Sequence, residues 1–317
     1  MISMLLSHPL NDLTVTDKFG KTPFAVAMAT KNNKAAQLIA DRHPSAVDMY
    51  DVRGRTYLHA AVQRGDLEGM LFLLSLGVDV NARTRDSDRF TPLHLAIKNA
   101  TNAVAPGVSE SIVRHLLLAG SDPNASTVRR ITPGHLAIAT PDLLQILLDG
   151  GADPNSVDDE HFNFLHTAMK ESRLPAVRVL LRHGKVNTTD AEGNSALLLG
   201  YMRGHSGLCK SLVKYGACLG TPNKQGVTIF NYQLATKTLL LRLLDCVGCE
   251  PPWAESETCL ECGNRFSLTT RKHHCRHCGR ILCSKCSSSV IPIIKFGLNK
   301  PIRVCQLCFD VLTLGAS

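Results

Sequence analysis

The sequence has no hydrophobic run that could cross a membrane and no leader that would export it. Its 317 residues contain no apolar stretch that approaches the roughly 18 residues of a spanning helix. Residues 1–6 are mostly apolar, but they lack a basic segment and are too short for a secretory signal peptide. These absences predict a soluble protein on the cytosolic side of the membrane.

Catalytic signatures are missing as well. The chain shows no Gly-rich phosphate loop, no nucleophile elbow and no paired-carboxylate pattern. Its content of 44% hydrophobic and 20% charged residues is that of a globular chain with a packed core. We therefore expect a folded binding protein rather than an enzyme.

Cysteine is absent from the first part of the chain and abundant at its end. None of the twelve cysteines precedes Cys209, and eight of them fall between Trp253 and Ser317. In a reducing compartment such clustering indicates metal binding, whereas the alternative, a disulfide framework, requires a secreted chain. The eight form four Cys-x-x-Cys pairs: Cys259/Cys262, Cys275/Cys278, Cys283/Cys286 and Cys305/Cys308.

These pairs have the spacing of zinc ligands. A Cys-x-x-Cys turn brings two thiolates to one tetrahedral zinc, so four pairs supply two closed structural sites without an open catalytic position. A segment this short cannot build a stabilising core, while each zinc contributes on the order of 10 kcal/mol of folding free energy. Cys246 and Cys249 form a further pair without a partner pair. We expect them to be structural or free, the alternative being competition for a zinc site.

A dense run of basic residues lies among the cysteines. Residues 271–280 read Arg-Lys-His-His-Cys-Arg-His-Cys-Gly-Arg, with four cationic side chains and three histidines. An arginine guanidinium can donate two parallel hydrogen bonds to phosphate oxygens, and an imidazole can donate to a phosphate or a hydroxyl. The run therefore predicts an anionic ligand. From Trp253 onward, nine Lys and Arg against four Asp and Glu give a formal charge of +5. Two zinc ions with eight thiolates reduce this to about +1, which argues against nucleic acid as the partner.

Together with Trp253, the Arg303-Val304-Cys305 sequence and the spacing of the eight cysteines, the basic run resembles the FYVE family of zinc fingers. The resemblance implies a cross-braced fold that binds two Zn²⁺ and reads phosphatidylinositol 3-phosphate. It implies that Cys259, Cys262, Cys283 and Cys286 hold one zinc, and that Cys275, Cys278, Cys305 and Cys308 hold the other. It also implies headgroup contacts from Arg271, Lys272, His273, His274, Arg276 and Arg303, and membrane insertion by Leu268 and Thr269.

One position departs from the family pattern. The usual Trp-x-x-Asp ends in Ser256 here, so the carboxylate expected to bond the free headgroup hydroxyls is missing, and Glu255 or Glu257 is the candidate replacement. A serine hydroxyl bonds more weakly than an ionised acceptor, so we expect reduced lipid selectivity. Two alternatives remain open: that His273 or His274 ligates zinc, and that Leu268 packs inside the module.

The residues before the zinc module repeat with a period near 33. Successive repeat positions are 34, 35, 41, 31, 32 and 33 residues apart, and Thr91–Ala96 reads Thr-Pro-Leu-His-Leu-Ala. Threonine caps a helix that proline begins, and this pattern resembles ankyrin repeats. We expect a mainly α fold with about seven repeats in residues 1–250, the first truncated and the last degenerate, and a zinc finger in residues 251–317. The aligned positions are Thr22, Thr56, Thr91, Thr132, Asn163, Ser195 and Thr228.

Histidine recurs at one repeat position, as His59, His94, His135 and His166. A residue that recurs with the period of the fold serves the fold, so we expect hydrogen bonds between repeats and no catalytic role.

Ankyrin repeats followed by a FYVE module resemble the ankyrin repeat and FYVE domain-containing proteins of the rabankyrin type. The resemblance implies a cytoplasmic adaptor, peripheral on the early endosome membrane, with protein partners on the ankyrin face. It further implies an effector of a Rab-family GTPase in endocytosis and macropinocytosis. One alternative is a zinc-dependent scaffold without lipid selectivity. The other is a RING-like ubiquitin ligase, a class that usually carries a ligating histidine where this module has an anion-binding run.

Overall fold

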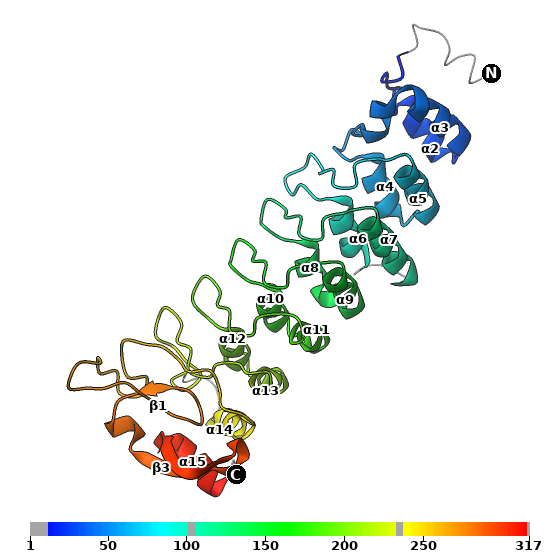
Figure 1. Ribbon diagram of the computed structural model, residues 1–317. Coiled ribbons are helices and arrows are strands. Elements are labelled where there is room, and N and C mark those ends of the chain that lie inside the picture. Colours follow the sequence, from blue (N-terminus) through cyan, green and yellow to red (C-terminus); the bar gives the residue numbers. More distant parts are fainter. Residues whose placement is uncertain (1–11, 101–105, 233–236, 316–317) are drawn as a thin grey trace. The chain divides into compact units, whose positions relative to one another are not determined.

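Helices dominate the computed structural model, which describes residues 12–100, 106–232 and 237–315 (Figure 1). The chain divides between Asp153 and Pro154 into two compact units. In these described ranges no helix has both the length and the apolar character that a membrane span requires.

The first unit consists of short helices that pack in successive pairs, with each pair contacting the next. It contains α2 (Pro23–Ala29), α3 (Asn33–Arg42), the 3-10 helix η1 (Pro44–Asp48), α4 (Tyr57–Arg64), α5 (Leu67–Ser75), α6 (Pro92–Ala100), α7 (Pro106–Leu118), α8 (Pro133–Leu136), η2 (Ala137–Ala139) and α9 (Pro141–Asp149).

The second unit continues the helix pairs and then changes to short strands. It contains α10 (Phe164–Lys170), α11 (Leu174–Leu180), α12 (Ala196–Met202), α13 (Ser206–Lys214), α14 (Lys237–Asp245), β1 (His273–His274), β2 (Ile281–Leu282), η3 (Lys285–Ser287), β3 (Ser289–Ile293), η4 (Ile294–Phe296), β4 (Leu298–Val304) and α15 (Gln306–Leu314).

Six of the predicted repeat positions stand directly before the first helix of a pair. At α4, Thr56 Oγ1 accepts from the His59 N–H at 3.5 Å, while His59 Nδ1 accepts from the Thr56 N–H at 3.3 Å. The other ring nitrogen, Nε2, therefore carries the proton, and it donates to Phe90 O of the next repeat at 3.0 Å. His94 and His166 make the equivalent bond at 3.1 Å each. The predicted hydrogen bond between repeats is confirmed at these three histidines.

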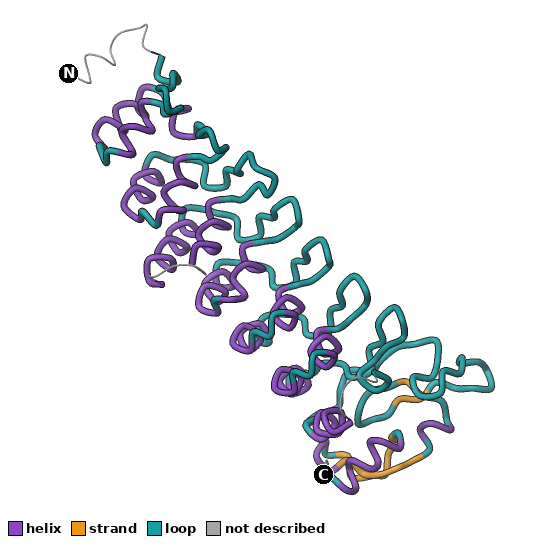
Figure 2. Tube along the Cα trace, turned by 180° about the vertical axis from the view of Figure 1, so that it is seen from behind, coloured by secondary structure: helices purple, strands orange, loops and turns teal. Residues whose placement is uncertain are grey.

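Hairpin loops connect the repeats. Within each unit, Figure 2 shows helices along one side and these loops projecting from the other. Main-chain bonds join neighbouring hairpins, from Arg85 N to Gly54 O at 2.8 Å in the first unit and from Lys224 N to Glu192 O at 2.9 Å in the second. The hairpins of one unit therefore form a continuous surface rather than separate loops.

The repeat that begins at Thr228 departs most from the pattern. Asn231 takes the position of the histidine, and its Oδ1 accepts from the Thr228 N–H at 2.6 Å. Residues 229–231 form turns rather than a helix, and α14 is the next described helix. The truncated repeat expected at residues 1–13 lies almost wholly outside the described residues.

The zinc module is built from two small antiparallel sheets and a helix. Strand β1 pairs with β2 and β3 pairs with β4, with an irregular register between Ile291 and Ile293. Helix α15 packs against β3 and against α14 of the last repeat. Cys218 in the repeats donates through Sγ to Pro252 O at 3.4 Å. The predicted fold class, mainly α with a small two-site zinc finger, is confirmed.

Candidate metal centre and anion-binding surface

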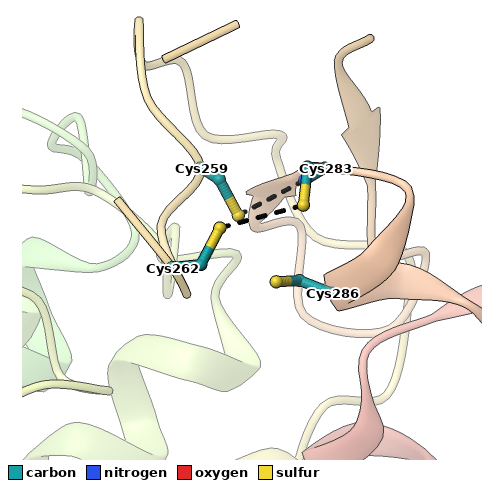
Figure 3. A group of neighbouring side chains, drawn as sticks. All are labelled: Cys259, Cys262, Cys283 and Cys286. Atoms are coloured by element: carbon teal, nitrogen blue, oxygen red, sulfur yellow. Dashed lines mark hydrogen bonds between the residues drawn. The ribbon is translucent and has the colours of Figure 1, made fainter. Parts of the chain in front are cut away.

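The four Cys-x-x-Cys pairs meet in two groups that alternate along the chain. In the first group the sulfur atoms of Cys259, Cys262, Cys283 and Cys286 lie within 4.8 Å of one another and face a common centre (Figure 3). The Cys262 and Cys283 sulfurs are 3.8 Å apart, and the Cys283 N–H donates to Cys259 Sγ at 3.3 Å. Hydrogen bonding from the Cys286 backbone outweighs burial and lowers the pKa of Cys283 to about 7. This favours the thiolate form that binds metal.

The second group is enclosed by the module. The sulfur atoms of Cys275, Cys278, Cys305 and Cys308 also lie within 4.8 Å of one another, and all four residues are buried. Cys305 is the N-cap of α15, which places Cys308 on the first turn of that helix. The Cys275 N–H donates to Arg280 O at 3.0 Å and Cys305 O accepts from the Phe309 N–H at 2.9 Å, so main-chain hydrogen bonds hold one cysteine of each pair.

Both groups fit tetrahedral zinc. Four sulfurs at about 2.3 Å from a zinc ion are separated by about 3.8 Å, the distance between Cys262 and Cys283. All twelve cysteines are free, and disulfide pairing would not gather sulfurs in fours. His273 and His274 belong to neither group. Each group would hold one Zn²⁺, and because four protein sulfurs fill a tetrahedron, the metal supplies structure rather than a reactive position.

Arg303 lies beside the basic run. The Arg276 N–H donates to Arg303 O at 3.0 Å, and the Arg303 guanidinium donates to Ser287 O at 2.7 Å. Burial, followed by the charges of Arg303, Arg271 and His274, lowers the pKa of His273 below its usual 6.5. The two arginines that act on this imidazole indicate a positive potential, which favours an anion at this point.

Trp253 positions two of the predicted headgroup residues. Its ring stacks on His274 with centroids 4.6 Å apart at 18°, and the Arg276 guanidinium lies 4.3 Å from the Trp253 ring centroid. Glu250 Oε1 accepts from Trp253 Nε1 at 3.3 Å and from Arg276 at 3.1 Å. His274 Nε2 bonds Ala254 O at 3.1 Å, which fixes the imidazole. Trp253 is the one tryptophan of the sequence and could be singled out there, but the sequence does not predict the hydrogen bonds to Glu250.

Glu257 contacts the basic run through Lys272. Its Oε1 lies 3.5 Å from Lys272 Nζ. Ser256, at the position of the family's aspartate, is bound locally, since its Oγ accepts from the Thr258 N–H at 3.1 Å. Of the two candidate replacements, Glu257 is the one that contacts a predicted headgroup residue.

Two residues of the basic run that are not among the expected headgroup contacts, His277 and Arg280, are buried. His277 is 0% exposed and stacks on Phe296, and Arg280 is 2% exposed. The ring nitrogens of His277 have no hydrogen-bond partner among the described residues. Both residues belong to the turn that closes around the second cysteine group, so the fold of the metal centre turns them inward.

Leu268 is 99% exposed at the tip of a short turn. The turn is closed by hydrogen bonds from Ser267 N to Thr270 O at 3.1 Å and from Thr270 N to Ser267 O at 3.2 Å. The neighbouring Thr269 is also exposed. The alternative that Leu268 packs inside the module is therefore wrong, and a closed turn presents an apolar side chain to solvent.

Family models match both halves of the chain. The FYVE zinc finger matches residues 251–314, and ankyrin repeats (3 copies) match residues 1–84, 101–190 and 135–225. Rabankyrin-5 of Mus musculus and of Homo sapiens are each 46% identical over 357 aligned positions, which cover 99% of this chain and 30% of theirs. The chain thus spans about 30% of the length of these relatives. The hepatocyte growth factor-regulated tyrosine kinase substrate of Drosophila melanogaster is 44% identical over 62 residues, 20% of this chain and 8% of that protein.

The ankyrin matches extend over most of the chain and agree with the helix pairs, while the zinc-finger match contains both cysteine groups. The chain therefore belongs to the ankyrin-repeat family, and a FYVE zinc finger follows its repeats.

Proposed function

We propose that the zinc finger binds phosphatidylinositol 3-phosphate on the early endosome membrane while the ankyrin repeats bind protein partners. The observation that carries this proposal is the clustering of Arg271, His273 and Arg303 in a module that also presents the exposed Leu268. A phosphate monoester is best held by several charge-assisted donors, and these side chains supply them. The protein would then be a peripheral adaptor without a catalytic step of its own.

Each headgroup residue has a chemical role in this proposal. Arg271, Arg276 and Arg303 offer guanidinium forks to the phosphate oxygens, and His273 and His274 donate to phosphate or ring hydroxyls. Lys272 adds charge at the rim. Glu257, which contacts Lys272, is the acceptor for the free hydroxyls in place of the family's aspartate. The two cysteine groups, when they hold zinc, fix β1 and β4 so that these side chains converge.

Membrane residence needs both the headgroup and the turn. Burial of one leucine contributes only about 1.5–3 kcal/mol, which by itself does not hold a protein on a bilayer. The bonds to the headgroup and the small apolar insertion form together and reinforce each other, and a partner on the repeats adds a further attachment. The proposal includes a Rab-family GTPase as one such partner and a role in endocytosis and macropinocytosis, and the similarity to Rabankyrin-5 favours the GTPase.

Liposome flotation over a panel of phosphoinositides tests the proposal. The zinc-loaded protein should prefer vesicles that contain phosphatidylinositol 3-phosphate. Arg276→Ala or Arg303→Ala should weaken binding at least about tenfold, since each removes a guanidinium that donates charge-assisted hydrogen bonds to the phosphate. Lys300→Ala removes an equal charge from an exposed part of β4 and should leave binding within about twofold.

Equal flotation on all anionic vesicles would favour the scaffold without lipid selectivity and refute the proposal. A ubiquitin-transfer assay with a purified conjugating enzyme addresses the ligase alternative, and we expect no transfer.

A further inference from the structure

The hairpins of the first unit carry arginines that do not recur in the hairpins of the later repeats. Three successive hairpins, residues 51–56, 82–91 and 124–131, contain seven arginines and three aspartates. The equivalent hairpins at residues 155–163 and 187–195 contain five Asp and Glu and no Lys or Arg. A feature that the repeat demands would recur with its period, as the histidines do. The basic charge is therefore local, which indicates a ligand. The arginines are Arg53, Arg55, Arg83, Arg85, Arg89, Arg129 and Arg130.

Two of the three aspartates point their oxygens into their own loops. Asp51 accepts from the backbone N–H of Arg55 at 2.9 Å and pairs with the guanidinium of the same residue at 2.9 Å. Asp86 Oδ1 accepts from Thr84 Oγ1 at 2.7 Å and from the Arg89 N–H at 2.9 Å. These carboxylates close the turns, so most of their hydrogen-bonding capacity is used before a ligand arrives.

The three hairpins are joined into one platform. Arg85 N donates to Gly54 O at 2.8 Å, and Val128 N donates to Asp88 O at 3.3 Å. Gly54 has φ +71°, and a Cβ there would lie 3.2 Å from Arg85 N. Only glycine permits this approach without strain, so the spacing of the arginines is held by the backbone.

An open groove of about 610 Å³ lies on this platform, lined by Tyr50, Asp79 and residues 81–86 and 89. The Arg85 guanidinium lies 3.9 Å from the Tyr50 ring centroid, a cation–π contact, and Arg85 is exposed among the residues that line the groove. Arg83 donates to Ser126 O of the next hairpin, and Arg89 is exposed. Three arginines and two aspartates thus face the groove, an excess of positive charge.

We propose that this groove binds an acidic segment of a partner protein. The inference deepens the proposed function, in which the repeats bind protein, by naming the surface and the chemistry of the partner. A guanidinium stacked on an aromatic ring presents a planar pair of N–H donors that matches a carboxylate. The volume of the groove, about 610 Å³, lies within the roughly 300–1,000 Å³ of ligand pockets. Val52 and Val128 on the flanking hairpins are 79% and 63% exposed, so apolar residues of a peptide find contacts that a free phosphate would not use.

Fluorescence anisotropy of the zinc-loaded chain with a labelled peptide of Asp, Glu and Leu tests the proposal, with the Asn and Gln analogue as the matched peptide. The acidic peptide should bind more tightly than the amide analogue, and more weakly as salt rises. The double change Arg85→Gln and Arg89→Gln should weaken binding at least about tenfold, whereas Arg114→Gln on α7, an exposed arginine outside the groove, should have little effect. Arg85→Lys should fall between, because lysine keeps the charge and loses the fork.

Equal binding of the two peptides, or an equal loss with Arg114→Gln, would overturn the inference. It would also be overturned if the double change left peptide binding intact and instead reduced flotation on phosphatidylserine vesicles, since the platform would then serve a membrane. Flotation on 3-phosphate vesicles separates this inference from the zinc-finger proposal, because Arg276→Ala should weaken that flotation at least about tenfold without changing peptide binding. Loss of both by Arg276→Ala would count against two separate sites.

Discussion

Removal of Arg280 tests how the zinc finger is attached to the last repeats. Its side chain is 3% exposed and lies 2.6 Å from Glu261 Oε2. It also donates to Cys305 Sγ at 3.2 Å, and its guanidinium stacks 3.9 Å from the ring centroid of Phe230 in the repeats. One guanidinium therefore links a predicted zinc ligand to an aromatic ring of the ankyrin array.

The expected cost of Arg280→Ala follows from these contacts. A hydrogen bond to an ionised thiolate contributes about 1.5–3 kcal/mol, and the stacking on Phe230 adds about 1 kcal/mol. The pair with Glu261 adds little, because that carboxylate is 51% exposed. With the packing of the buried stem, the loss comes to about 3–5 kcal/mol, as is usual when one partner of a buried charge pair is removed. For a unit of this size the melting temperature should fall by roughly 10 °C.

Differential scanning calorimetry of the zinc-loaded protein measures this change. Arg265→Ala is the matched control, since it removes an exposed arginine from the same module and should shift the melting temperature by less than about 2 °C. Gly220→Ala perturbs the same contact from the ankyrin side, because the new Cβ would lie 2.9 Å from Ala254 Cβ and 3.1 Å from Arg280 Cγ. A shift within about 2 °C for Arg280→Ala would show that the guanidinium contributes less than about 1 kcal/mol and would refute the reasoning.

Three further predictions concern the membrane turn, the metal and a buried histidine. Leu268→Ser should weaken vesicle binding by about 10- to 100-fold without changing affinity for the soluble headgroup, measured by flotation and calorimetry, because it removes about 1.5–3 kcal/mol of apolar burial in the bilayer. A zinc chelator should unfold the module while the repeats stay folded, seen as a change in Trp253 fluorescence at nearly constant helical circular dichroism; an unchanged Trp253 signal would contradict the zinc requirement. Burial lowers the pKa of His94 to about 4, so the unfolded chain takes up this proton first as pH falls. The free energy of unfolding of the first unit should therefore be constant above pH 6.5 and fall by about 3 kcal/mol between pH 6.5 and 4, measured by urea unfolding. His94→Gln should flatten that pH dependence. An identical slope in the variant would exclude His94 as its source.

The parts of the fold that sequence predicted well depend on short-range signals. Thr56 and His59 lie three residues apart, so the cap, the first helix and the histidine bond all follow from local geometry. The Cys-x-x-Cys spacing likewise identifies the zinc pairs. Spacing alone does not decide which pairs share a metal, and the alternating arrangement came from resemblance to the FYVE family.

The parts that sequence missed depend on contacts between distant residues. Arg276 and Arg280 are equivalent in a count of basic residues, but Arg276 stacks on Trp253 at the surface while Arg280 is buried against Phe230. Nothing in the run of residues 271–280 distinguishes them. The platform arginines were visible in the sequence, yet a search for positions that recur with the repeat passes over residues such as Arg85 that do not recur.

The charge of the zinc finger explains why a second attachment matters. Much of its positive charge is already paired, since Lys272 contacts Glu257, Arg276 contacts Glu250 and Arg280 is buried. The long-range field of the zinc finger therefore contributes little to binding an anionic membrane, and membrane binding by this module depends on the headgroup site and on one leucine. If the groove beside Arg85 holds an acidic partner that is itself on the membrane, the second contact becomes intramolecular, and overall affinity rises by about 10²–10⁴. Weakening either site should then shorten membrane residence far more than it changes the affinity of the other site measured alone.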